Sequence, residues 1–374
     1  MNILANTRVL SHPTTGVERY LIELLARMVP DIAQCAPQSP LGGIKGHAWE
    51  QLVLPAKLRG RLLFSPCNTG PLAVKNQVVT IHDVAALDHP EWLNAKFALW
   101  YRWLTPRLAR RCRHIIAVSE FTRGRIIAHT GIPPEKITVI PNGVDARFKP
   151  MAPEAILAAL APLALPSRRY ILSLGSIEPR KNLPRLLQAW AKILPTLPPD
   201  IWLVVAGGSN ARIFAAANAM GDKETGREKP RAAANPQASP AGQNGNSAPL
   251  RVHYAGRVAD DLLPALYAGA MAFAYMSVYE GFGLPPLEAM AAGVPVLTGN
   301  LTSLPEVVGD AGIMVNPLDT DAVAGGLLQL IENAELRARL GSAGMQRSRQ
   351  FTWDKSAEKT MAVLREMNIR HAAS

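Results

Sequence analysis

Short apolar runs alternate with longer amphipathic segments along the chain, and this pattern occurs twice. In the first half it predicts helices near 16–29, 95–112 and 120–129, and strands at 2–5, 62–65, 77–81, 114–118 and 137–140. A stretch rich in Pro and Ala follows at 150–166. The second half predicts helices near 182–194, 260–269, 284–292 and 319–333, and strands at 170–175, 201–206, 251–255, 271–276, 294–298 and 313–315. Such alternation is typical of βαβ units and parallel sheets.

Two doubly wound α/β domains are therefore expected, because compact domains usually contain about 100–200 residues and this chain has 374. We expect a first domain at 1–165 and a second at 166–350. In the closing segment, 351–374, a helix at 354–367 should pack back on the first domain. Residues 209–249 lack an apolar period and predict a flexible surface insertion. Facing sheets predict a cleft in which ligands bind at the carboxyl ends of strands.

Composition places the chain among globular proteins, with 48% hydrophobic and 18% charged residues. The cysteines Cys35, Cys67 and Cys112 are widely spaced and form neither a metal pattern nor a disulfide framework. A reducing, cytoplasmic location is expected. The sequence also lacks a run of ~20 apolar residues that would predict a membrane span, and its start does not resemble a signal peptide.

Positive charge is concentrated in the first half, where residues 1–150 carry +9 of the net +11. Much of it lies on the helix predicted at 95–112, where basic residues alternate with apolar ones. This helix packs as an ordinary solvated helix, rests peripherally on the anionic inner face of the plasma membrane, or meets an acidic lipid-linked acceptor. The basic residues are Arg102, Arg107, Arg110, Arg111 and Arg113, and the apolar ones are Phe97, Trp100, Trp103, Leu104 and Leu108. Nucleic acid is not an expected partner, because the aromatic residues do not form a stacking platform.

The segment from Tyr279 to Gly293, with the sequence YEGFGLPPLEAMAAG, is the most informative motif. It follows an apolar strand, passes through a glycine turn and enters a helix with Pro in its first turn. The free N–H groups of such a helix start bind phosphate or hydroxyl oxygens. Its two carboxylates, Glu280 and Glu288, are suited to binding paired hydroxyls because each offers several acceptor positions.

This motif resembles the retaining glycosyltransferases of family 4, whose GT-B fold consists of two facing Rossmann-like domains. The resemblance implies that Glu288 binds the ribose of a nucleotide sugar and that Glu280 binds the donor sugar near the reaction centre. It also implies contacts from the Gly281, Phe282, Gly283 and Leu284 segment to the sugar and diphosphate. The alternative is that both glutamates are solvated residues at a helix end.

A second motif, Gly175-Ser-Ile-Glu-Pro-Arg180-Lys181-Asn182, lies between a predicted strand and helix. Arg180 and Lys181 match the diphosphate-binding pair of the same family. Arg can hold phosphate oxygens in a bidentate fork and Lys adds a compact charge, so protein cations would replace a metal at the leaving group. Further on, Val258 matches a position whose backbone meets the nucleobase, and Asp260 or Asp261 is expected to cap the next helix.

The first domain contains fewer motifs that indicate its function. Thr14-Thr15-Gly16-Val17 lies where related enzymes place a glycine loop near the diphosphate, although relatives often have two glycines. A plain turn is the alternative for Gly16. His82 and Asp83 follow the strand at 77–81 and resemble a pair that lines the reaction centre. Ser119 is expected to cap a helix, and Asn142-Gly143 to form a turn.

The resemblance implies a hexosyltransferase that retains anomeric configuration and needs no metal or cofactor. Asp319-Thr320-Asp321 has the form of a metal-binding Asp-x-Asp, but it is interpreted as a helix cap. The sequence of the glutamate motif is similar to that in bacterial mannosyltransferases of surface polysaccharides. GDP-mannose is therefore the favoured donor, UDP-sugars remain open, and the acceptor is a glycan or a lipid-linked molecule.

Two other classes of protein are compatible with parts of this pattern. A nicotinamide-dependent oxidoreductase shares Rossmann-like sheets, but the sequence lacks Gly-x-Gly-x-x-Gly after a predicted strand. A non-catalytic sugar-nucleotide-binding subunit is the second alternative. The joint presence of Arg180, Lys181, Glu280 and Glu288 favours an active enzyme.

Overall fold

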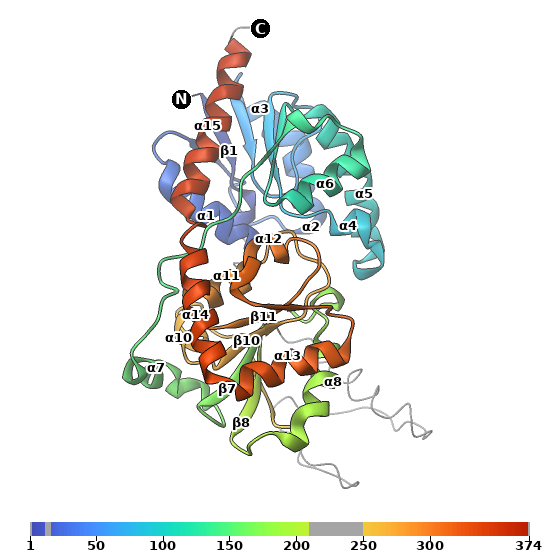
Figure 1. Ribbon diagram of the computed structural model, residues 1–374. Coiled ribbons are helices and arrows are strands. Elements are labelled where there is room, and N and C mark those ends of the chain that lie inside the picture. Colours follow the sequence, from blue (N-terminus) through green and yellow to red (C-terminus); the bar gives the residue numbers. More distant parts are fainter. Residues whose placement is uncertain (1, 12–15, 209–249, 373–374) are drawn as a thin grey trace.

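The computed structural model describes residues 2–11, 16–208 and 250–372, and in these it forms two lobes stacked one above the other (Figure 1). Each lobe contains a parallel six-stranded sheet, in the orders β2-β1-β3-β4-β5-β6 and β12-β11-β10-β7-β8-β9. The prediction of an α/β fold with two doubly wound sheets is confirmed. The insertion expected at 209–249, together with Thr14 and Thr15, lies outside the described residues.

The first sheet is built from β1 (Ile3–Asn6), β2 (Ala33–Cys35), β3 (Leu62–Ser65), β4 (Gln77–Ile81), β5 (His114–Ala117) and β6 (Ile137–Val139). The second is built from β7 (Arg169–Leu174), β8 (Ile201–Ala206), β9 (Val252–Gly256), β10 (Ala272–Tyr275), β11 (Val296–Gly299) and β12 (Ile313–Val315). Every residue of β3, β4, β5 and β10 is buried. Strands of parallel sheets are covered on both faces, which is why these runs are apolar almost throughout.

Helices cover both sheets. The first lobe has α1 (Gly16–Met28), α2 (Gly43–Ala48), a π-helical turn η2 (Trp49–Val53), α3 (Leu54–Lys57), α4 (Ala85–Asp88), a 3-10 turn η3 (Pro90–Trp92), α5 (Ala95–Arg111) and α6 (Glu120–Thr130). The second has α7 (Pro153–Leu160), a 3-10 turn η6 (Pro179–Lys181), α8 (Leu183–Ile193), α10 (Leu263–Ala268), α11 (Leu284–Ala291), α12 (Leu304–Val308), α13 (Thr320–Glu332) and α14 (Ala334–Ser348). Within the described ranges, every helix is too short or too polar to cross a bilayer.

Each predicted strand is present within two residues of its expected bounds, but several elements were not predicted. β2 was missed because it is three residues long and two of them are exposed. Helix α7 falls in the Pro- and Ala-rich stretch that was interpreted as a connection. Helix α14 contains Gly341 and Gly344, which weaken helices in general. Here they allow close packing, because a Cβ at Gly341 would overlap the carbonyl oxygen of Gly293 behind α11.

The last helix, α15 (Trp353–Ala372), runs along the first lobe beside α1 (Figure 1). Its Trp353 and Leu364 are fully buried and share one apolar cluster with Tyr20 of α1 and Phe64 of β3. The two segments that join the lobes also meet there. The backbone N–H of Val144 donates to Phe351, and Val144 forms a β-bridge with Thr352.

Candidate functional site

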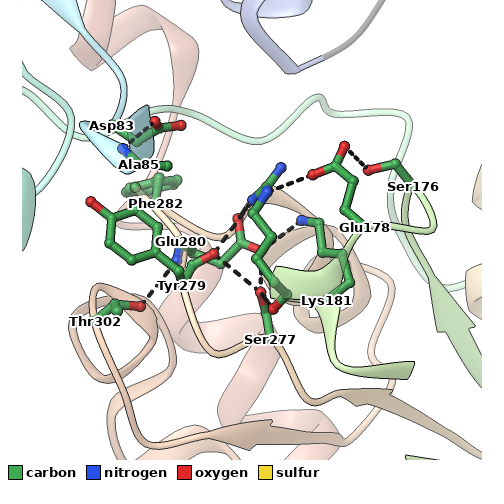
Figure 2. A network of polar contacts seen from close by, with 12 residues as sticks. Asp83, Ala85, Ser176, Glu178, Lys181, Ser277, Tyr279, Glu280, Phe282 and Thr302 are labelled. Carbon is green, nitrogen blue, oxygen red and sulfur yellow. Dashed lines mark hydrogen bonds and ion pairs between the residues drawn. The ribbon is translucent and has the colours of Figure 1, made fainter. Parts of the chain in front are cut away.

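A buried carboxylate with two cationic partners lies at the carboxyl ends of the second sheet. Oε1 of Glu280 is 2.6 Å from Nζ of Lys181, and Oε2 is 3.1 Å from Nη1 of Arg180. The hydroxyls of Ser277 and Tyr275 donate to the same carboxylate at 2.6 and 2.8 Å. Glu280 is 7% exposed, so its charge depends on these partners and not on water. Figure 2 shows the carboxylate between Lys181 and Ser277.

Two neighbouring strands position this cluster. Arg180 and Lys181 follow β7 on the turn η6, and Ser277 and Glu280 follow β10, which pairs with β7. The two loops are tied together, because the carbonyl of Arg180 accepts from the Val278 N–H at 2.8 Å and from the Ser277 hydroxyl at 2.9 Å. The parallel sheet thus brings together two motifs that are about a hundred residues apart.

The charges of the cluster are mutually dependent. Burial alone would raise the pKa of Glu280, but Lys181 and Arg180 outweigh it and lower that pKa to about 2. Burial lowers the pKa of Lys181, and the Glu280 carboxylate acts against this effect. Because Lys181 and Arg180 are 13% and 25% exposed, the cations are shielded but accessible from the domain junction. An anion that reaches them is bound in a medium of low dielectric constant.

The loop after Glu280 rests directly on the first lobe. A Cβ at Gly281 would overlap the carbonyl oxygen of His82, so only glycine fits at this approach. The Gly281 carbonyl also accepts from the hydroxyl of Ser119 at 2.6 Å. His82 and Asp83 follow β4, and Figure 2 shows Asp83 beside the loop that carries Tyr279 and Phe282. The ends of the two sheets therefore meet at this point.

Helix α11 begins at the same junction. Gly283 has φ 116°, a left-handed conformation that favours glycine, and it turns the chain into the helix. A Cβ on Gly16, at the start of α1, would lie 3.6 Å from the Leu284 side chain, so the two helix starts approach each other. In the first turn of α11, Pro285 and Pro286 have no N–H and the N–H of Leu287 donates to Gly283, so the N–H of Leu284 is left without an intrahelical acceptor. Its partial positive charge adds to the positive potential of Arg180 and Lys181.

Glu288, on the second turn of α11, lies in a separate buried cluster. Its carboxylate accepts from Tyr267 at 2.9 Å and from Arg19 of α1 at 3.4 Å. Burial raises the pKa of Glu288 to about 7, although Arg19 and Tyr267 act in the opposite direction. Val258 is 9% exposed and belongs to the same apolar cluster as Tyr267. The predicted nucleobase and ribose residues thus lie in one region.

A third cluster joins the lobes beside Glu280. The hydroxyl of Tyr279 donates to Asp88 at 2.7 Å, and Asp88 is also bound by Arg125 and His129 of α6. Burial would raise the pKa of Asp88, but the hydrogen bonds from Arg125, His129 and Tyr279 lower it to about 2. The ring of Tyr279 has edge contacts to His89, 5.5 Å between centroids, and to other aromatic rings of the first lobe.

Of the residues predicted from the sequence, Arg180, Lys181 and Glu280 form one cluster, and Gly281 contacts His82. Gly16 lies beside Leu284, while Val258 and Glu288 share the Tyr267 region. Phe282 is 6% exposed and packs against Phe351, so its side chain belongs to the core of the junction. The caps at Ser119 and Asp319 are confirmed, because both side chains accept from N–H groups of the following helix.

The expected cap at Asp260 or Asp261 is wrong. Helix α10 begins later, at Leu263, and its start has no side-chain cap. Asp260 instead accepts from Arg19 across the domain junction at 2.6 Å. Arg19 and Asp88 were missed as site residues. Nothing local in the sequence marks them, because their partners are 269 and 191 residues away in the chain. Within the described part of the chain, three or more His, Cys, Asp or Glu residues do not gather as a metal site.

Comparison with known proteins adds independent findings. A family model described as glycosyl transferases group 1 matches residues 168–333, and one described as Glycosyltransferase Family 4 matches residues 64–148. The O-antigen chain mannosyltransferase B of Escherichia coli is 31% identical over 293 residues, which are 78% of this chain and 70% of the relative. The MMP alpha-(1->4)-mannosyltransferase of Mycolicibacterium hassiacum is 27% identical, over 75% of this chain and 61% of its own length.

Solved structures show the same fold. Anabaena HepE, in complex with UDP and glucose, superposes over 97% of this chain and 99% of its own with a TM-score of 0.70 and 19% identity. WaaG, described as a glycosyltransferase involved in lipopolysaccharide biosynthesis, superposes over 97% and 99% with a TM-score of 0.71 and 17% identity. The two-lobed arrangement is therefore that of known glycosyltransferases.

Proposed function

Because the chain belongs to glycosyltransferase family 4 and has the GT-B fold, we propose that it transfers mannose from GDP-mannose, with retention of anomeric configuration and without a metal. The acceptor is a glycan or a lipid-linked molecule in the synthesis of a surface polysaccharide. The observation that carries this proposal is the buried cluster of Arg180, Lys181 and Glu280 at the start of α11. The choice of mannose rests on the names of the similar bacterial proteins.

In this proposal the second domain, 166–350, binds the donor. Arg180, Lys181 and the N–H groups of Gly283 and Leu284 bind the diphosphate, and Glu280 accepts from hydroxyls of the donor sugar. Glu288 accepts from the ribose, and the backbone at Val258 contacts the base. A diphosphate is suited to this region because Arg180, Lys181 and the start of α11 all contribute positive charge to it.

The first domain, 1–165, binds the acceptor, and the segment 351–374 completes its surface. Gly16 approaches the diphosphate, and His82 and Asp83 line the reaction centre opposite Glu280. The Gly281–His82 contact supports this assignment, because it fixes the first domain directly beside the donor-binding loop. Closure of the two domains excludes water from the transferred sugar.

The mechanism follows from the leaving group. As the bond between the anomeric carbon and the diphosphate oxygen breaks, negative charge develops on the diphosphate and is stabilised by Arg180 and Lys181. The acceptor oxygen forms its new bond on the same face of the sugar, and its proton passes to the leaving phosphate oxygen. This front-face transfer, which the family resemblance implies, needs neither a covalent enzyme intermediate nor a metal.

The experiment is a panel of nucleotide sugars tested for protection against thermal unfolding, followed by transfer of a labelled sugar. A donor that binds only the folded state must raise the unfolding midpoint. GDP-mannose should give the largest rise, EDTA should not reduce transfer, and NMR should identify the retained anomer. A larger rise of the unfolding midpoint with UDP-glucose would identify a different donor and leave the enzyme class unchanged. Absence of stabilisation by every member would contradict the proposal.

A peripheral contact with an anionic membrane is a further part of the proposal. Phe97 and Trp103 of α5 are 43% and 42% exposed, although Leu104 and Leu108 of the same helix are buried. The exposed rings lie among the exposed basic residues Arg102, Arg107, Arg110 and Arg111. Rings of this kind insert at a membrane interface while guanidinium groups meet lipid phosphates.

This contact is tested by sedimentation with lipid vesicles. The wild type should sediment with vesicles that contain phosphatidylglycerol and remain in solution with phosphatidylcholine alone. Replacing both Arg107 and Arg111 by Gln should reduce sedimentation several-fold at low salt. The matched variant changes Arg337 and Arg339 of α14 to Gln and should sediment like the wild type. Equal sedimentation by both double variants would contradict the membrane contact.

A further inference from the structure

A pair of stacked rings lies at the edge of the domain junction, on the segment that runs from the end of α4 through η3. The rings of His89 and Trp92 have centroids 3.8 Å apart and planes inclined by 13°. Both residues are only partly buried. Figure 1 shows α4 on the side of the first lobe that faces the second. The carboxylate of Glu91, which is 61% exposed, accepts from Nδ1 of His89 at 3.0 Å.

The segment that carries these rings is held from both lobes. Asp88, directly before His89, is bound by Arg125 and His129 of its own lobe and by the hydroxyl of Tyr279 from the other. The Tyr279 ring is inclined by 82° to the His89 ring and by 76° to the Trp92 ring, with centroids 5.5 Å and 6.1 Å away. A surface that is fixed in this way loses less conformational entropy when a ligand binds than a mobile one does.

The position of the ring pair relates it to the donor site. Tyr279 immediately precedes Glu280, the carboxylate assigned to the donor sugar. On the first lobe, the segment that begins at Asp83 runs through α4 to Trp92, with the Asp83 carboxylate accepting from the N–H of Ala85. One short segment therefore connects the reaction centre with the partly exposed rings.

We propose that His89, Trp92 and Glu91 form a subsite for a sugar ring of the acceptor, so that the acceptor is recognised as a glycan at this point. The inference rests on the proposed function and deepens it. A flat aromatic face packs against the C–H groups of a pyranose, and a carboxylate beside it accepts from the hydroxyls at the ring edge. This subsite combines both groups.

The chemistry distinguishes this subsite from a lipid contact. Within the segment 88–92, an acyl chain would leave the charged groups of Asp88 and Glu91 and the imidazole of His89 beside hydrocarbon, which is unfavourable. A sugar satisfies polar and apolar groups together. Leu52 of η2, which is 77% exposed on the same lobe, has neither a ring nor a carboxylate and serves for comparison.

The test is saturation-transfer NMR with methyl α-mannopyranoside as the probe, in the presence of GDP to occupy the diphosphate site. The wild type should transfer saturation to the ring protons of the probe. Trp92→Ala should reduce the transfer several-fold, and Trp92→Phe should recover part of it because a flat ring is retained. Leu52→Ala on η2, an exposed residue of the same lobe, is the matched control and should behave as the wild type.

Steady-state transfer supplies a second readout. Trp92→Ala should raise the acceptor KM about tenfold while the donor KM and the hydrolysis of donor without acceptor stay unchanged. If Trp92 had a merely structural role, its replacement would impair acceptor KM, donor KM and donor hydrolysis together. That outcome would overturn the subsite. Wild-type signals that are absent, or that Trp92→Ala leaves intact, would also overturn it. Failure of the proposed function is distinct, because then no nucleotide sugar stabilises the wild type.

Discussion

Glu280 is the residue on which the proposed donor site most depends. It is surrounded by Lys181, Arg180, Ser277 and Tyr275, so the same carboxylate that is assigned to the sugar also holds both diphosphate cations in position. The sequence motif predicted that Glu280 and the Arg-Lys pair serve one site. Their direct contact was not predictable, because it depends on the pairing of β7 with β10.

We expect Glu280→Gln to abolish transfer and to lower stability at neutral pH. The pKa of Glu280 falls from an ordinary 4.5 to about 2 on folding. A lowered carboxylate pKa contributes stability above 4.5, and this contribution is lost as the pH falls toward 2. This difference in pKa corresponds to about 3 kcal/mol in the free energy of unfolding at pH 7.

Urea unfolding at a series of pH values measures this effect. The gap between the wild type and Glu280→Gln should be largest near pH 7 and should shrink as the pH falls below 4.5. Glu178→Gln is the matched control, because Glu178 also binds Arg180 but is 45% exposed. Glu178→Gln should lower the free energy of unfolding by less than Glu280→Gln does. An equal loss for the two variants would show that burial of the carboxylate is unimportant.

Glu288 should show the opposite pH dependence. Its pKa is raised by burial from 4.5 to about 7, so the folded protein prefers the protonated form. The stability contributed by protonated Glu288 is fully present below pH 4.5 and is lost as the pH rises through 7. The free energy of unfolding of Glu288→Gln should therefore exceed that of the wild type by about 3 kcal/mol at pH 8 and match it near pH 4.5.

Thermal unfolding at pH 5 and pH 8 checks this prediction, and nucleotide-sugar binding by Glu288→Gln should weaken at both. Glu358→Gln, at an exposed position inside α15, should leave the unfolding midpoint unchanged. A Glu288→Gln variant that is less stable than the wild type at pH 8 would contradict the account of this cluster.

At the scale of elements, the loop between β10 and α11 is fixed by its glycines. The sequence predicted the strand, the turn and the helix start at these residues. It did not predict that Gly281 abuts the His82 carbonyl of another sheet. The same limit explains the missed helix α14, whose glycines are needed for contact with α11. In both places a tertiary contact requires the glycine, and local sequence patterns do not reveal such contacts.

Gly281→Ala is expected to displace this loop. A Cβ there overlaps backbone of the first lobe, which cannot move aside as a flexible side chain could. We predict at least a hundredfold loss of transfer and a lower unfolding midpoint. Gly325→Ala in α13 is the control, because a Cβ there meets nothing within 4 Å. It should keep full activity and gain up to about 1 kcal/mol from helix propensity. Equal activity of the two variants would refute the proposed packing.

At the scale of the molecule, carboxylates and helix starts join the two lobes. Glu306 of α12 accepts from the N–H groups of Glu120 and Phe121, at 2.8 and 2.7 Å, at the start of α6 in the other lobe. The predicted strands within each half agree with the structure, apart from β2, which was missed. The contacts between halves could not be predicted, since each joins residues that are remote in the chain.

Glu306→Gln should loosen this junction. The carboxylate charge stabilises the positive end of α6, so its removal weakens the contact between the lobes. Hydrogen exchange of the Glu120 and Phe121 amides should become several-fold faster, while amides of β5 in the same lobe should keep their rates. Unchanged exchange at the start of α6 would show that Glu306 does not hold the lobes together.

The most direct measurement is a crystal structure of the chain with the nucleotide sugar that stabilises it most. Our account predicts the diphosphate within hydrogen-bonding distance of Arg180, Lys181 and the amides of Gly283 and Leu284, with Glu280 at the sugar and Glu288 at the ribose. A donor bound away from these groups, with the Glu280 cluster intact and untouched, would contradict it.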